Sequence, residues 1–252
     1  MENNQNFHEN YIEGRNAVLE AFRSGKTIDK LFVLDGCQDG PIKSITREAR
    51  KHDTIITYVA KERLEQMSET GKHQGVIAVS AAYEYASVDD ILENARAKGE
   101  APFVIILDGI EDTHNLGAII RTANLAGAHG IIIPKRRAVG LTPTVAKTSA
   151  GAINYTPVAK VTNISNTIKE LKDQGMWFVC ADMGGTPMYD LNLTGSIGLV
   201  IGNEGEGVSK LVKENCDIVA SIPMKGDIDS LNASVATGVL TYEIVRQRLN
   251  KG

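Results

Sequence analysis

Short apolar runs alternate with amphipathic stretches along the whole chain. In the first third, apolar residues three and four positions apart predict helices, and runs of four or five mostly apolar residues predict strands. We expect helices at residues 15–24, 42–51 and 61–67, and strands at residues 30–34, 55–59 and 76–79. This order predicts a small α/β domain, which we place at residues 7–83.

A second α/β block is predicted for residues 102–252. Residues 103–107 are apolar without interruption, which is typical of a parallel strand buried on both faces. Further strands are expected at residues 130–133, 177–181, 198–201 and 217–220, with helical patterns between them. Such alternation favours a parallel sheet covered by helices, closed by a last helix between residues 231 and 250. The acidic, helix-prone residues 84–101 are interpreted as a linker that includes a short helix.

The composition is that of an ordinary globular protein, with 42% hydrophobic and 23% charged residues in a chain of 252. The first ten residues are polar, and no apolar run approaches the ~20 residues that span a bilayer. We therefore expect a cytoplasmic protein without a membrane partner. The three cysteines and five histidines show no metal-ligand spacing, so we predict no metal and interpret the cysteines as core residues.

The charge is unevenly distributed, although the net value of −4 does not suggest a generally basic protein. Residues 113–169 contain no Asp or Glu, whereas the whole chain contains 31. The positive charges of this segment are Arg121, Lys135, Arg136, Arg137, Lys147, Lys160 and Lys169. The pattern favours an electropositive face for a phosphate backbone; the alternative is a solvated face that happens to lack acids.

Three polar clusters, at residues 108–121, 202–207 and 222–232, each follow a predicted strand. In an open α/β sheet, the loops that leave the carboxyl ends of the strands converge on one crevice. The three clusters therefore predict a shared site.

The middle cluster does not fit a dinucleotide. Its glycines at 202, 205 and 207 miss the G-x-G-x-x-G spacing, and Glu204 and Glu206 would repel a pyrophosphate. A cationic ligand without phosphates suits it better, and S-adenosylmethionine carries a sulfonium. The alternative is a tight turn whose acids cap a helix that starts near Gly207.

The other two clusters lie at predicted helix starts. We expect Asn115 to cap the helix that carries Arg121, with the small Gly117 beside the Arg121 stem so that a substrate can approach. Ser230 or Asn232 could cap the last helix, and the segment that starts at Ile222 leaves backbone groups free to read an adenine. A simple cap plus a surface arginine is the alternative for the first cluster.

Taken together, the motifs N-x-G-x-x-x-R, I-G-x-E-G-x-G and I-P-M…S-L-N-x-S-V-A resemble those of the SpoU family of RNA 2′-O-ribose methyltransferases in the SPOUT superfamily. In the amino-terminal block, Gly14-Arg15-Asn-Ala-Val and His73-Gln74-Gly75-Val are similar to the substrate-binding domain of the subgroup that methylates a guanosine in 23S ribosomal RNA.

The resemblance implies a SPOUT domain with a deep trefoil knot, S-adenosylmethionine as cofactor, and a homodimer with the active site near the subunit interface. By resemblance, Gly202, Ile222 and Leu231 supply main-chain contacts to the cofactor. The active-site positions are Asn115, Arg121, Glu204, Ser230 and Asn232. For RNA binding we predict the basic side chains Arg15, Lys135, Arg136, Arg137 and Lys147.

In the implied reaction a ribose 2′-oxygen attacks the methyl carbon. Arg121 is expected to position RNA phosphate and stabilise the developing alkoxide, because a guanidinium stays charged. Glu204 would orient Arg121 or Asn115, and Ser230 and Asn232 would hold the ribose. DNA, which lacks the 2′-hydroxyl, is not an expected substrate. A transfer RNA enzyme, a resistance-type ribosomal RNA methylase and a non-catalytic RNA-binding assembly factor remain alternatives.

Overall fold

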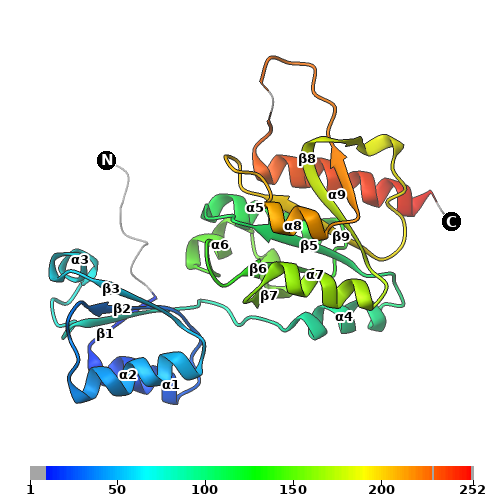
Figure 1. Ribbon diagram of the computed structural model, residues 1–252. Coiled ribbons are helices and arrows are strands. Elements are labelled where there is room, and N and C mark those ends of the chain that lie inside the picture. Colours follow the sequence, from blue (N-terminus) through cyan, green and yellow to red (C-terminus); the bar gives the residue numbers. More distant parts are fainter. Residues whose placement is uncertain (1–9, 229, 251–252) are drawn as a thin grey trace. The chain divides into compact units, whose positions relative to one another are not determined.

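The computed structural model describes residues 10–228 and 230–250, so the predicted start of the first domain at residues 7–9 lies outside the described residues. The chain divides into two compact units (Figure 1). Of the described residues, one unit contains 10–84 and 140–143, and the other contains 85–139, 144–228 and 230–250. No helix in the described part of the chain is long and apolar enough to cross a membrane.

The first unit is a mixed four-stranded sheet covered by helices, with the strand order β1-β4-β2-β3. Strands β2 and β3 are parallel, and β4 runs antiparallel to β1 and β2. Its elements are β1 (Tyr11–Glu13), α1 (Arg15–Arg23), β2 (Ile28–Leu34), α2 (Gly40–Lys51), β3 (Ile55–Val59), α3 (Lys61–Met67) and β4 (Val76–Ser80).

Helix α2 illustrates how local sequence sets these bounds. Asp39 caps its start, because the side chain accepts a hydrogen bond from the Ile42 N–H, and Pro41 lies in the first turn, where no intrahelical N–H is needed. The apolar face, including Ile42 and Ile45, is buried in the same core cluster as Val18 of α1 and Leu31 of β2.

The second unit is a six-stranded parallel sheet with the order β10-β8-β9-β5-β6-β7. Its strands are β5 (Phe103–Asp108), β6 (Gly130–Pro134), β7 (Val158–Val161), β8 (Trp177–Pro187), β9 (Ile197–Gly202) and β10 (Ile218–Ser221). Its helices are α4 (Val88–Ala97), α5 (Thr113–Leu125), α6 (Pro143–Thr148), α7 (Ile164–Asp173), α8 (Lys210–Asn215) and α9 (Ala233–Leu249), with short 3₁₀ turns at Ala152–Asn154 and Met188–Asp190. The parallel α/β architecture predicted from the sequence is confirmed.

Helix α4 belongs to the core of the second unit. Ile91 and Leu92 are buried in the same cluster as Val104 and Ile132, and a Cβ on Gly130 would overlap the Ile91 side chain. The segment that we interpret as a linker therefore contributes a packed helix to this unit.

The carboxyl ends of the parallel strands lie at one edge of the sheet, which is where the three polar clusters begin. An irregularity in β8 adds to this edge: Val219 of β10 pairs with Cys180, but the next residue, Ala220, pairs with Thr186. Residues 181–185 therefore bulge out of the ladder, as bulges next to functional sites commonly do. The threading that makes a trefoil knot stays a prediction.

Candidate active site

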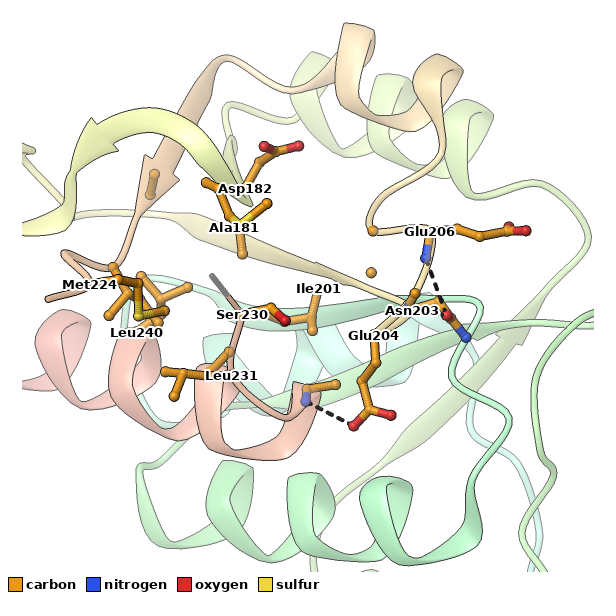
Figure 2. A pocket seen from close by; sticks show the side chains of 18 residues that line it. Ala181, Asp182, Ile201, Asn203, Glu204, Glu206, Met224, Ser230, Leu231 and Leu240 are labelled. Atoms are coloured by element: carbon orange, nitrogen blue, oxygen red, sulfur yellow. Dashed lines mark hydrogen bonds between the residues drawn. The ribbon is translucent and has the colours of Figure 1, made fainter. Parts of the chain in front are cut away.

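A pocket of about 260 Å³ lies between the bulged part of β8, the ends of β9 and β10, and the start of α9 (Figure 2). Part of its wall is apolar and is formed by Ile201, Ile222, Leu231 and Leu240. The charged lining residues are all acidic, namely Asp182, Glu204 and Glu206. The pocket thus combines an apolar surface with a negative rim.

Three of the predicted site residues form one hydrogen-bonded network. The Asn115 Nδ2 donates to Glu204 Oε1 over 2.9 Å, and the Asn232 Nδ2 donates to Asn115 Oδ1 over 2.9 Å and also to Glu204 Oε1. The Ala233 N–H completes the set with a 3.1 Å bond to the same Glu204 oxygen (Figure 2). The expected convergence of the three polar clusters is therefore present in this unit.

The position of Asn115 predicted that it would be the N-cap of its helix, but it is not. Helix α5 begins two residues earlier, at Thr113, and Asp112 is the cap, whose Oδ1 accepts a 2.8 Å bond from the Asn115 N–H. The Asn115 side chain is therefore released from capping and is available to the network. An Asp three residues before Asn115 was a readable capping signal.

Asn232 serves the network and the helix at once. Its Oδ1 accepts hydrogen bonds from the Ser234 and Val235 N–H groups, so Asn232 is the N-cap of α9. Of the two residues predicted as possible caps, Ser230 and Asn232, it is Asn232 that has this role. Both ends of its amide are thereby used. Ser230 lines the pocket, is exposed, and makes no hydrogen bond within the described chain.

The glycine loop after β9 is closed on itself. Asn203 and Gly207 exchange two backbone hydrogen bonds, and a Cβ on Gly202 would overlap the Gly207 backbone, so only glycine fits there. The Asn203 Nδ2 also donates to the Gly109 carbonyl over 2.9 Å, which joins this loop to the one after β5. The acids of the loop do not cap the next helix: α8 begins at Lys210, and Asp108 accepts the Ser209 N–H.

Arg121 lies elsewhere in this chain. It is exposed on α5 and is absent from the pocket lining, and Glu204 contacts Asn115 and not Arg121. The expectation that Gly117 lets a substrate approach is wrong, because a Cβ there would overlap the Thr148 side chain of α6. Gly117 is small because two helices pack closely at that point.

The basic residues predicted to bind RNA fall into two groups. Lys135, Arg136 and Arg137 form a turn directly after β6, at the same sheet edge as the pocket, and Lys147 is exposed in the last turn of α6. Arg15 lies in the first unit, and its guanidinium already contacts the Asp39 carboxylate at 2.6 Å and the Gln74 carbonyl at 3.0 Å.

One acid of the pocket is held in its charged form by a lysine of α8. Lys213 donates to Asp182 over 2.7 Å, and this hydrogen bond is the main cause that lowers the pKa of Asp182 below its ordinary value. Asp182 is thus a carboxylate at neutral pH. It also fastens the bulged part of β8 to α8.

The lining fits S-adenosylmethionine, the cofactor that the motifs imply. Asp182 is paired with Lys213, but the carboxylates of Glu204 and Glu206 complement a sulfonium and an ammonium group, and no Lys or Arg is among the described residues that line the pocket. Residues 222–224 lie outside any helix or strand, and no backbone hydrogen bond ties Met224 or Leu231 to the described chain. Free backbone donors and acceptors next to apolar side chains can read the edge of an adenine. Gly202, Ile222 and Leu231, the predicted cofactor contacts, all line this pocket.

Comparison with known proteins gives two family matches. Residues 102–242 match the SpoU rRNA Methylase family, and residues 11–86 match the family described as RNA 2′-O ribose methyltransferase substrate binding. The chain is 49% identical over 240 residues to YacO of Bacillus subtilis, which is named as a TrmH family tRNA/rRNA methyltransferase; the match covers 94% of this chain and 96% of that protein.

Solved structures share the fold. The SpoU methyltransferase AviRb from Streptomyces viridochromogenes, in complex with the cofactor AdoMet, is 25% identical with a TM-score of 0.60, and the match covers 95% of this chain and 90% of that one. The TrmH/SpoU tRNA modifying enzyme of A. aeolicus is 30% identical with a TM-score of 0.56, but the match covers 61% of this chain and 78% of that one. The chain therefore belongs to the SpoU rRNA Methylase family and is an S-adenosylmethionine-dependent RNA 2′-O-ribose methyltransferase.

Proposed function

We propose that this enzyme methylates the 2′-hydroxyl of a guanosine in 23S ribosomal RNA, as a cytoplasmic homodimer. The observation that carries the proposal is the Asn115–Glu204–Asn232 network at the rim of an acidic pocket that Ser230 lines. The network holds three distant stretches of the chain in one arrangement, which is what an in-line displacement needs from its enzyme.

The roles of the site residues in the reaction follow from which of their polar atoms already have hydrogen-bond partners in the protein. When bound, S-adenosylmethionine supplies an electrophilic methyl group on a sulfonium. Asn232 is fully engaged by the helix cap and the network, so it positions the site and does not hold the ribose. Ser230, whose hydroxyl has no partner in the described chain, holds the ribose. Glu204 receives all its bonds on Oε1, which leaves Oε2 as a free acceptor next to the substrate.

The homodimer is supported by an exposed apolar face on α5 and α9, two helices that pack together. Val235 and Tyr242 of α9 are about half exposed, and Leu125 of α5 is 67% exposed. Other residues of α9, such as Leu240 and Ile244, are buried in its own unit, so the helix is apolar on two sides and needs a second partner. A second copy of this chain covers that face.

This face also explains the position of Arg121. Arg121 and Leu125 are four residues apart on α5, so they share a side of the helix. An interface built on Leu125 brings Arg121 to the partner subunit, where it completes the partner's pocket. There Arg121 positions RNA phosphate and stabilises the alkoxide that forms as the 2′-oxygen attacks.

Two observations favour ribosomal RNA as the substrate. The tRNA modifying enzyme of A. aeolicus matches only 61% of this chain, and the family that matches residues 102–242 is described as an rRNA methylase family. Lys135, Arg136 and Arg137 supply positive charge at the edge where the pocket opens, and we assign them and Lys147 to the RNA backbone.

The test is a methylation assay with radiolabelled S-adenosylmethionine and total RNA from a strain that lacks the protein. Label on a single guanosine ribose of 23S RNA is expected, and DNA of the same sequence should receive none. Label on transfer RNA, or on another 23S nucleotide, would support the alternative methyltransferase substrates. Cofactor binding without any transfer to RNA would support the assembly-factor alternative.

A further inference from the structure

The two motifs of the amino-terminal block, Gly14-Arg15-Asn16 and His73-Gln74-Gly75, meet at a hollow that the proposed reaction does not use. The hollow has a volume of about 570 Å³ and is lined by residues that include Arg15, Asn16, Leu34, Cys37, Pro41 and Gln74. It lies within the first unit, which matches the substrate-binding family over residues 11–86. We call it the amide hollow, after Asn16 and Gln74.

Gln74 is held in a costly backbone conformation at this hollow. Its φ is +52°, in the left-handed region that a glutamine rarely adopts. The Gly75 N–H donates to His73 Nδ1, and the Gln74 Oε1 accepts the Arg15 N–H over 3.1 Å, so both the turn and the amide are fixed. The Gln74 Nε2 has no partner in the described chain. Strain of this kind is commonly retained where a side chain must be presented to a ligand.

Arg15 is not available as a phosphate ligand. Its guanidinium donates to the Asp39 carboxylate and to the Gln74 carbonyl, and it lies 3.8 Å from Cys37 Sγ. Asp39 stays ionised, because the Ile42 N–H and then Arg15 lower its pKa. The ion pair therefore leaves no uncompensated positive charge on Arg15 to hold a phosphate in the hollow.

Other lining groups suit a nucleobase. The side chain of Asn16 is exposed and makes no hydrogen bond within the described chain, so two amides offer both donors and acceptors. Leu34 and Pro41 supply apolar surface. A nucleobase is flat and uncharged, with a mixed donor and acceptor edge, and unstacked bases of single-stranded RNA are read in this way by proteins.

We propose that the amide hollow binds one unstacked nucleobase of the RNA substrate, with Asn16 and Gln74 reading its edge and Arg15 acting as a positioning residue. This inference rests on the proposed function only in requiring that RNA is the substrate. It adds a second recognition point, separate from the nucleotide that is methylated.

The first test uses the native thiol of the hollow as a reporter. Full-length protein is treated with N-ethylmaleimide, with and without saturating ribosomal RNA from a strain that lacks the protein, and alkylation of each cysteine is followed by mass spectrometry. We expect RNA to slow the alkylation of Cys37 at least tenfold. An unchanged Cys37 rate while RNA is bound overturns the proposal.

The second test separates base reading from phosphate binding. Asn16→Ala and Gln74→Gly should each raise the KM for RNA about tenfold, with kcat at saturating RNA and the Kd for S-adenosylmethionine unchanged. Glycine suits the positive φ, so Gln74→Gly removes the amide without backbone strain. Gln66→Ala, an exposed amide of α3 in the same unit, is the matched control and should behave like the wild type.

The salt dependence of RNA binding distinguishes a base contact from a phosphate contact, and a phosphate contact would overturn the proposal. Loss of a base contact leaves the slope of log K against log salt unchanged, whereas loss of a phosphate contact makes it shallower by about one unit. Tighter RNA binding by Asp39→Asn, or a shallower slope in Asn16→Ala or Gln74→Gly, shows that the hollow binds phosphate. If the wild type transfers no methyl group to RNA, the proposed function fails; if it does and both variants keep a normal KM, only this inference fails.

Discussion

Two glutamates, one in each unit, accept three hydrogen bonds each, and they do so differently. Glu13 at the end of β1 uses both carboxylate oxygens, which bind Ser68 Oγ, the Glu69 N–H and Thr70 Oγ1. These donors are consecutive in the chain, so Glu13 fastens one loop. Glu204 uses Oε1 alone, and its donors come from α5 and from the start of α9. A glutamate that accepts three hydrogen bonds is structural when its donors are neighbours in the chain. It contributes to a functional site when its donors come from distant segments and one carboxylate oxygen stays free.

The strongest way to break this comparison is to neutralise each glutamate. In Glu204→Gln the amide oxygen can keep the bonds that Oε1 accepts, but the negative charge and the free acceptor Oε2 are lost, so methyl transfer to RNA should fall by about 100-fold or more. Glu13→Gln should keep the wild-type kcat within about twofold. Both are measured by transfer of radiolabel at saturating RNA. Equal losses in the two variants would mean that Glu204 is only a structural fastener.

Substitutions of Arg121 test whether the site around Glu204 needs an arginine that the pocket of the same chain does not contain. Arg121→Lys keeps the charge but not the planar fork, and we expect it to lower kcat by about tenfold. Near-normal turnover of Arg121→Lys would show that a point charge is enough.

A complementation experiment then decides where Arg121 acts. Arg121→Ala and Glu204→Ala are each expected to be inactive, and mixed together they should regain about a quarter of wild-type activity, since half of the dimers are mixed and each mixed dimer has one intact site. No recovery on mixing, in a sample shown to exchange subunits, would place Arg121 in the pocket of its own chain.

A smaller effect on kcat is expected for Asp112, which caps the helix that carries Asn115 but is not itself part of the Asn115–Glu204–Asn232 network. Asp112→Ala removes the N-cap of α5 and should lower the free energy of unfolding by about 1 kcal/mol, with a several-fold loss of kcat because Asn115 is less firmly held. Ser87→Ala is the matched control, since Ser87 caps α4 by the same kind of bond. Urea unfolding should show a similar loss for both, and a similar loss of kcat for both would contradict the role of Asp112 in the site.

The sequence predicted most of the strands but missed two at the sheet edges. Strand β3 and helix α3 have the predicted bounds, because turn residues and apolar periods both mark them. Strand β1, of three residues, and β7, in which Lys160 interrupts the apolar pattern, were not predicted. Both are edge strands, which tolerate short or mixed sequences.

The site was predictable as a set of residues but not as a set of contacts. Motif spacing identified Asn115, Glu204 and Asn232, yet capping propensity assigned Asn115 to a task that Asp112 performs. The error arose because Asn is favourable both at a cap and in a polar network, and local sequence does not distinguish the two. The reason for Gly117 lies in α6, 31 residues away at Thr148, which no local pattern contains.

The smallest expected effect is on the pH dependence of stability, to which Glu13 contributes through its charge. Burial opposes ionisation of Glu13, but the bonds from Ser68, Thr70 and Glu69 outweigh it and lower its pKa. Because the folded pKa lies below the unfolded one, this stabilisation is present at neutral pH and is lost as the pH falls through the folded value. Glu13→Gln should therefore be less stable than the wild type by about 1 kcal/mol at pH 7, as judged from the usual worth of such bonds, and the two should converge towards pH 3. Urea midpoints across this range measure it, and a constant difference at every pH would mean that shape, and not charge, makes the Glu13 contacts favourable.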